Sequence, residues 1–207
     1  MANSPQAPGA TAKSRETILA TATGGMAIAL ASVLSLIKLF DMPQGGSVTV
    51  ASMLPILFCA LTFGPVWGLG IAAVYGVLQF VISPYAAHWA SIFLDYPLAF
   101  GLLGLAGFFA APASRRLDER NVLRRLSMVK PANIVIGVIV GMLGRTVSHV
   151  LSGVIFYASY AEGTGLNPWM YSLVYNGSYM LPEAIITLVV LLPLAFAFRR
   201  PVQPHRA

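Results

Sequence analysis

The hydrophobic positions of this chain gather into six long runs, separated by short segments of glycine, proline and polar residues. The runs cover residues 17–40, 48–63, 66–83, 91–112, 131–158 and 170–198. A helix needs about 20 apolar residues to cross the hydrocarbon core of a bilayer, and fewer where neighbouring helices shield its ends. The second and third runs are the shortest, and Gly64 with Pro65 marks a turn between them. The pattern predicts an all-α integral membrane protein with six transmembrane helices.

The composition supports this class, because 57% of the residues are hydrophobic and only 10% are charged. Soluble domains usually have about 25% charged residues, so lipid must be the main solvent of this chain. Residues 1–16 begin with small and polar residues and predict a disordered N-terminal tail. Residues 17–198 hold the six runs as one membrane domain, and residues 199–207 form a basic tail. The single cysteine, Cys59, offers neither a disulfide nor a metal-binding spacing.

Apart from Lys38 and Arg145, lysine and arginine lie on one side of the predicted bundle. They precede the first run, fill the loop after the fourth run and follow the sixth run: Lys13, Arg15, Arg115, Arg116, Arg120, Arg124, Arg125, Lys130, Arg199, Arg200 and Arg206. The loops on the other side, DMPQGGS, SPYAAHWA and YAEGTGLNPW, contain neither residue type. By the positive-inside rule, both tails are cytoplasmic. The net charge of +6 therefore reflects topology and contact with anionic lipid, and we predict no nucleic-acid partner.

Several ionisable residues lie inside the apolar runs, where a charge is costly and normally faces the protein interior in a functional role: Asp95, Arg145, His149 and Glu183. In the fifth run, polar and small residues recur every four positions and share one helix face: Arg145, His149, Gly153 and Tyr157. The sixth run carries a second polar face, with Tyr171 and Tyr175 one position round: Ser172, Asn176, Tyr179 and Glu183. Together they predict a binding site toward the outer half of the bundle.

The chemistry of these side chains favours a small, flat, nitrogen-rich cation. A carboxylate beside aromatic faces suits a delocalised positive charge, and His149 and Asn176 add directional hydrogen bonds. Other interpretations stay open from the residues alone. Asp95 could pair with Arg145, and Gly153 could serve only helix packing. The outer aromatic residues could form an interfacial belt: Tyr157, Trp169 and Tyr171.

Several activities lack their motifs in this sequence. There is no phosphate-binding G-x-x-x-x-G-K-[ST] loop, so ATP hydrolysis would belong to partner subunits. We predict no enzymatic activity, no catalytic residue, no cofactor and no metal site. In the first run, Ala27 and Ala31 are one helical turn apart, with Gly25 and Ala29 beside them, and this spacing predicts a docking face for a partner helix. Ordinary packing within the chain would explain the same spacing.

Three segments resemble a known family: MPQGGSVTVASMLPI (42–56), FLDYPLAF (93–100) and residues 145–180 with their H-x-x-x-G and Y-S-L-x-x-N patterns. They resemble the thiamin-specific S components (ThiT/YuaJ family) of energy-coupling factor (ECF) transporters. The resemblance implies the six-helix S-component fold in the plasma membrane of a prokaryote. It also implies capture of thiamin from outside and docking to a transmembrane coupling protein (T component) with two ABC-type ATPases.

The resemblance also assigns substrate-binding residues: Asp95, Tyr96, Arg145, His149, Gly153, Tyr157, Tyr171 and Asn176. Trp169 is added because it lies near a position where some members have a tryptophan, and the lid tryptophan of the first outer loop is missing here. Asp95 would face the thiazolium ring, and His149 with Asn176 would hold the aminopyrimidine. The alternatives are an S component for a thiamin precursor of the hydroxymethylpyrimidine type, or a stand-alone secondary transporter of a small cation.

Overall fold

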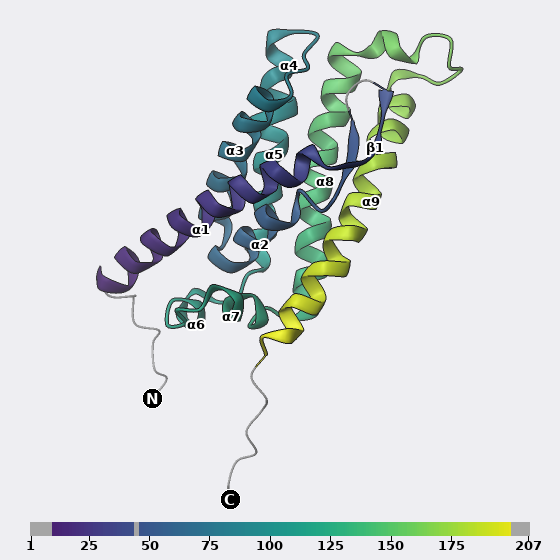
Figure 1. The fold of residues 1–207 in the computed structure, drawn as a ribbon. Coiled ribbons are helices and arrows are strands. Elements are labelled where there is room, and N and C mark those ends of the chain that lie inside the picture. The colour runs from purple at the N-terminus through teal and green to yellow at the C-terminus, as the bar shows by residue number, and fades with distance from the viewer. Residues whose placement is uncertain (1–9, 44–45, 200–207) are drawn as a thin grey trace, which may run out of the picture.

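The computed structural model describes residues 10–43 and 46–199, and these are mostly helical (Figure 1). The six membrane segments are α1 (Ala10–Leu36), α2 (Leu54–Phe63), α3 (Pro65–Ile82), a composite segment over Trp89–Phe109, α8 (Pro131–Phe156) and α9 (Pro168–Ala197). All of them except α2 are long and apolar enough to cross a membrane. The chain is therefore a multi-pass membrane protein, as the hydrophobic pattern predicts.

The short helix α2 does not need to span the bilayer, because the protein surrounds it. Eight of its ten residues are buried. The predicted second run, 48–63, is thus helical only from Leu54, and the predicted first run, 17–40, is helical only as far as Leu36.

A small β-hairpin connects these two segments of the otherwise helical domain. β1 (Lys38–Asp41) pairs antiparallel with β2 (Ser47–Thr49). Lys38 and Asp41 form an exposed ion pair at 2.8 Å. Pro43 follows them, and proline disfavours helical geometry in the residue before it. The polar, proline-containing stretch therefore forms a strap at the outer end of α1, and the strap comprises residues 38–43 and 46–49.

The fourth segment changes helix type three times along its length. It comprises α4 (Trp89–Phe93), the π-helix η2 (Leu94–Leu98), α5 (Ala99–Gly101) and the 3-10 helix η3 (Leu102–Phe109). Pro97 lies inside η2 and has no N–H for the carbonyl four residues earlier, which favours a locally wider turn. In η3, a side chain on Gly104 would collide with the backbone of α3, so glycine permits this close helix approach.

The N-terminal helix begins earlier than predicted. Residues 10–16 of the predicted disordered tail belong to α1, whereas residues 1–9 and 200–207 lie outside the described residues. Glu16 anchors this end of α1, because its carboxylate accepts a 2.6 Å hydrogen bond from the Arg125 Nη1 of α7 (Val122–Ser127). Burial, and the nearby positive charge of Arg125, lower the pKa of Arg116 in α6 (Ala113–Arg116), while Glu16 opposes this shift.

The two described ends of the chain lie at the same end of the molecule, next to α6 and α7 (Figure 1). This is the end that carries the basic residues, as the cytoplasmic assignment of both tails requires.

Ala27 and Ala31 do not form an exposed docking face, so this prediction is wrong. They are 6% and 0% exposed and belong to the core of the chain. The Tyr75 hydroxyl of α3 donates to the Ala31 carbonyl at 3.3 Å. The small side chains let α1 pack closely inside the chain, and Gly25 and Ala29 lie on its exposed side instead.

Candidate functional site

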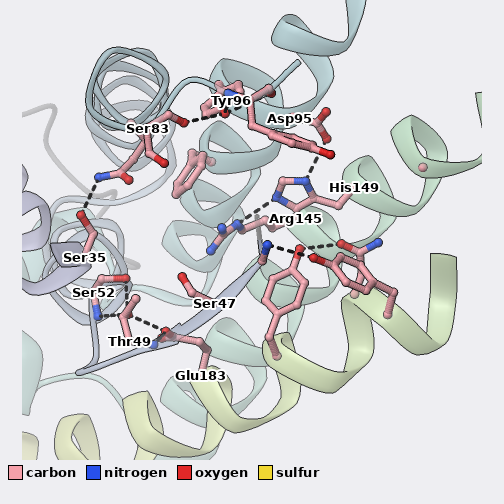
Figure 2. A pocket seen from close by; sticks show the side chains of 18 of the residues that line it. Ser35, Ser47, Thr49, Ser52, Ser83, Asp95, Tyr96, Arg145, His149 and Glu183 are labelled. Carbon is pink, nitrogen blue, oxygen red and sulfur yellow. Dashed lines mark hydrogen bonds and ion pairs between the residues drawn. The ribbon is translucent and has the colours of Figure 1, made fainter. Parts of the chain in front are cut away.

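A cavity of about 400 Å³ lies between the strap, α3, η2, α8 and α9 (Figure 2). It extends from the outer loops, at Tyr85 and Tyr160, down to Glu183 in α9. Eight of the nine predicted substrate-binding residues line it: Asp95, Tyr96, Arg145, His149, Gly153, Tyr157, Tyr171 and Asn176. Its size falls in the range of small-molecule sites, which is roughly 300–1,000 Å³.

Trp169 is the exception, and its predicted place in the site is wrong. Its side chain is 56% exposed and is not among the described residues that line the cavity. Successive residues of an α-helix are rotated by about 100°, so Trp169 and Tyr171 point about 200° apart. Since Tyr171 faces the cavity, Trp169 faces the surroundings of the protein.

Asp95 is held by hydrogen bonds on both carboxylate oxygens. Its Oδ1 lies 3.0 Å from Nδ1 of His149, and its Oδ2 accepts a 2.7 Å bond from the Ser152 hydroxyl. The side chain remains 14% exposed and lines the cavity. The wide π-helical turn of η2 therefore presents a fixed carboxylate that a ligand can still reach.

Arg145 reaches Asp95 only through His149 (Figure 2). Among residues 10–43 and 46–199, the salt bridges of Asp95 include no arginine. Arg145 Nε instead donates to His149 Nε2 at 3.3 Å, and the guanidinium lies 4.1 Å from the ring centroid of Phe100. Since arginine can only donate, His149 must accept at Nε2 and carry its proton on Nδ1, toward Asp95. The direct Asp95–Arg145 pair that the sequence left open is not formed.

Tyrosine side chains surround the outer part of the cavity. Tyr157 stacks on Tyr85 and on Tyr160, with ring centroids 5.9 and 5.7 Å apart. The hydroxyls of Tyr85 and Tyr160 lie 2.7 Å apart and join two outer loops. Partial burial and this hydrogen bond raise the pKa of Tyr85, so its phenol stays protonated. Neither Tyr85 nor Tyr160 was predicted for the site, since a loop tyrosine has no helical spacing that would reveal its direction.

The strap is fixed to α9 at its outer end. Tyr175 accepts a hydrogen bond from the Gly46 amide and donates to the Pro43 carbonyl, both at 2.9 Å. Tyr175 also stacks on Tyr171, with centroids 6.2 Å apart. Its position in the cavity lining follows from the polar face of the sixth run.

A second anchor of the strap lies at the inner end of the cavity. Oε1 of Glu183 accepts hydrogen bonds from the amide and the hydroxyl of Thr49, both at 2.5 Å. Glu183 is 1% exposed. This buried carboxylate thus ties β2 to α9.

The remaining predicted residues have structural partners as well. The Tyr96 hydroxyl donates to the Ser83 carbonyl at 2.9 Å, which holds the loop after α3. The Asn176 side-chain amide donates to the Ser172 carbonyl at 2.9 Å. A side chain on Gly153 would collide with Ser172, so this glycine allows α8 and α9 to pack closely where both line the cavity. Gly153 therefore serves helix packing as well as the cavity wall.

A metal site is not apparent in the part of the chain that the structure describes, where no three His, Cys, Asp or Glu side chains form a suitable group. The fold and the cavity instead define a membrane protein with a buried, partly polar site for a small molecule.

Comparison with known proteins assigns the chain to a family. Residues 21–202 match the thiamine transporter protein (Thia_YuaJ) family, and the chain belongs to it. It is 33% identical over 168 residues to the thiamine transporter ThiT of Bacillus subtilis (strain 168), covering 81% of this chain and 84% of that protein. It is 30% identical over 143 residues to ThiT of Lacticaseibacillus paracasei, covering 67% and 68%.

A solved structure has the same fold. ThiT from Listeria monocytogenes superposes with a TM-score of 0.72 and 22% sequence identity, over 87% of this chain and 95% of that one. The expected S-component fold is therefore confirmed.

Proposed function

We propose that this protein is the thiamin-binding subunit of an ECF transporter, capturing thiamin from outside the cell. One observation carries the proposal: Asp95, inside the membrane domain, lines an aromatic cavity, and no lysine or arginine among the described residues pairs with it. A carboxylate in such surroundings attracts a delocalised cation, and the thiazolium ring of thiamin is one. The names of the relatives support the same ligand.

The other cavity residues fit the remaining parts of thiamin. The side chains of Tyr157 and Tyr171 line the cavity, where they would contact the rings of thiamin. His149 and Asn176 would hold the aminopyrimidine, which has both donors and acceptors. Arg145 would lie near the hydroxyethyl group, because its guanidinium lines the cavity and can only donate.

Uptake would be driven by partners. The sequence has no phosphate-binding loop, so we propose that a T component and two ABC-type ATPases supply the energy. The exposed side of α1, with Gly25 and Ala29, is the small-residue face available to such a membrane partner. The protein itself would then be a binding subunit and not an enzyme.

The test is a calorimetric titration of the purified, ligand-stripped protein with thiamin. Calorimetry is preferable to tryptophan fluorescence, because none of the three tryptophans, all of them in the described ranges, lines the cavity. Saturable, tight binding of thiamin and weak binding of hydroxymethylpyrimidine would support the proposal. Tighter binding of the precursor would identify a precursor transporter. Accumulation of thiamin by proteoliposomes that contain this chain alone would identify a secondary transporter.

A further inference from the structure

The Asp95 carboxylate has a second partner that does not belong to the cavity wall. Ser152 Oγ donates to Asp95 Oδ2 at 2.7 Å. Ser152 is 0% exposed, and the described residues that line the cavity do not include it. Its hydroxyl therefore does not contact a ligand in the cavity directly, but it does contact Asp95, which lines the cavity.

A second serine, one helical turn earlier on α8, holds the backbone of η2, the segment that contains Asp95. Ser148 Oγ donates to the Leu94 carbonyl at 2.7 Å. Leu94 opens the π-helix η2, in which Pro97 cannot supply a backbone hydrogen bond. Because Ser148 and Ser152 are four residues apart, they lie on one face of α8, and this face holds η2.

The two bonds on the carboxylate fix its orientation and leave it able to accept more. His149 approaches one oxygen of Asp95 and Ser152 the other, so the carboxylate plane cannot rotate freely. An ionised carboxylate has about four acceptor positions, and these two bonds occupy two of them. Hydrogen bonds to a charged acceptor are roughly twice as strong as neutral ones, so losing the buried Ser152 hydroxyl should be measurable.

We propose that Ser152 is a positioning residue for ligand binding, which holds Asp95 in the orientation that faces the cationic ring of the ligand. The inference rests on the proposed thiamin-binding function and adds a residue to it.

The experiment is a double-mutant cycle of Ser152→Ala and Asp95→Asn, read by calorimetric titration with thiamin. In the otherwise unchanged protein, Ser152→Ala is expected to weaken binding about tenfold. In the Asp95→Asn background, the same change is expected to weaken it less than threefold, because the carboxylate that it positions is gone. Thr146→Val is the matched control. It removes an α8 hydroxyl that donates to the Met142 carbonyl at 2.8 Å and does not line the cavity, and it should leave the affinity unchanged.

The outcomes separate this inference from the proposed function. If the unchanged protein binds thiamin but Ser152→Ala has the same effect with and without Asp95→Asn, Ser152 serves only the fold and the inference is overturned. If the unchanged protein does not bind thiamin, the proposed function fails and the inference fails with it. Should the alanine variant not fold, Ser152→Cys replaces it in the cycle, since a thiol is of similar size and a weak donor.

Discussion

Replacing Asp95 by asparagine removes one negative charge from the cavity with almost no change of shape. The amide oxygen can accept from His149, and the amide nitrogen can donate to the Ser152 hydroxyl, which is free to rotate. Asp95→Asn should therefore fold normally, and its effect on binding should report the charge.

The size of the effect follows from the position of the carboxylate. Two unit charges about 4 Å apart interact by about 4 kcal/mol at an effective dielectric constant of 20. The Asp95 side chain is 14% exposed, so water screens part of this attraction. About 2–3 kcal/mol remains as the expected loss, which corresponds to roughly 30- to 150-fold weaker binding.

The assay is calorimetric titration of ligand-stripped protein with thiamin, at two salt concentrations. Asp118→Asn is the matched control, because this carboxylate after α6 is exposed and does not line the cavity. Its removal should change thiamin affinity less than twofold. Equal affinity of Asp95→Asn and the unchanged protein for thiamin would refute the electrostatic argument. An equal loss for an analogue with an uncharged ring would refute it too.

Three further predictions concern the buried ion pair near the cytoplasmic end, the packing of α8 on α9, and the strap. Glu16→Gln leaves the buried Arg125 without its ion-pair partner and should reduce the free energy of unfolding by about 3–5 kcal/mol; a thermal unfolding temperature in detergent equal to that of the unchanged protein would contradict this. Gly153→Ala forces a methyl group against Ser172 and should cost about 1–3 kcal/mol of stability. Adding Ser172→Ala should restore part of that stability in the same melting experiment, and no recovery would show that the contact is not the cause. Tyr175→Phe removes both bonds to the strap and should speed thiamin dissociation, measured in stopped-flow displacement; an unchanged rate would show that this anchor does not hold the strap over the ligand.

The helical spacing of the polar residues was enough to predict that they face one cavity, because the direction of a side chain on a helix depends only on its position along that helix. Arg145 and His149 are one turn apart on α8, so their shared direction follows from helix geometry alone. Asp95 was found because a carboxylate in an apolar run must face protein. The partner of Arg145 could not be predicted in this way. Arg145 could contact Asp95 directly or through His149, and the outcome depends on where the π-helical turn of η2 places Asp95 relative to α8.

The docking face predicted at Ala27 and Ala31 also depended on tertiary packing that the sequence does not give. Ala27 and Ala31 let any helix approach closely, and the sequence does not say whether that helix belongs to this chain or to a partner. The structure resolves this in favour of α3. By contrast, the sequence alone could have excluded Trp169 from the site. Trp169 and Tyr171 are two positions apart on one helix and point in nearly opposite directions, so only one of them can face the cavity.

The charges around the cavity suggest why a cation is the natural ligand. The described charged residues that line it are Lys38, Asp95, Arg145 and Glu183. Lys38 is neutralised by Asp41 at 2.8 Å. Arg145 then stands against two carboxylates among the described lining residues, Asp95 and Glu183. A charge without a partner is costly inside a membrane protein, so a ligand with one positive charge would supply a partner for the Asp95 carboxylate as it fills the cavity.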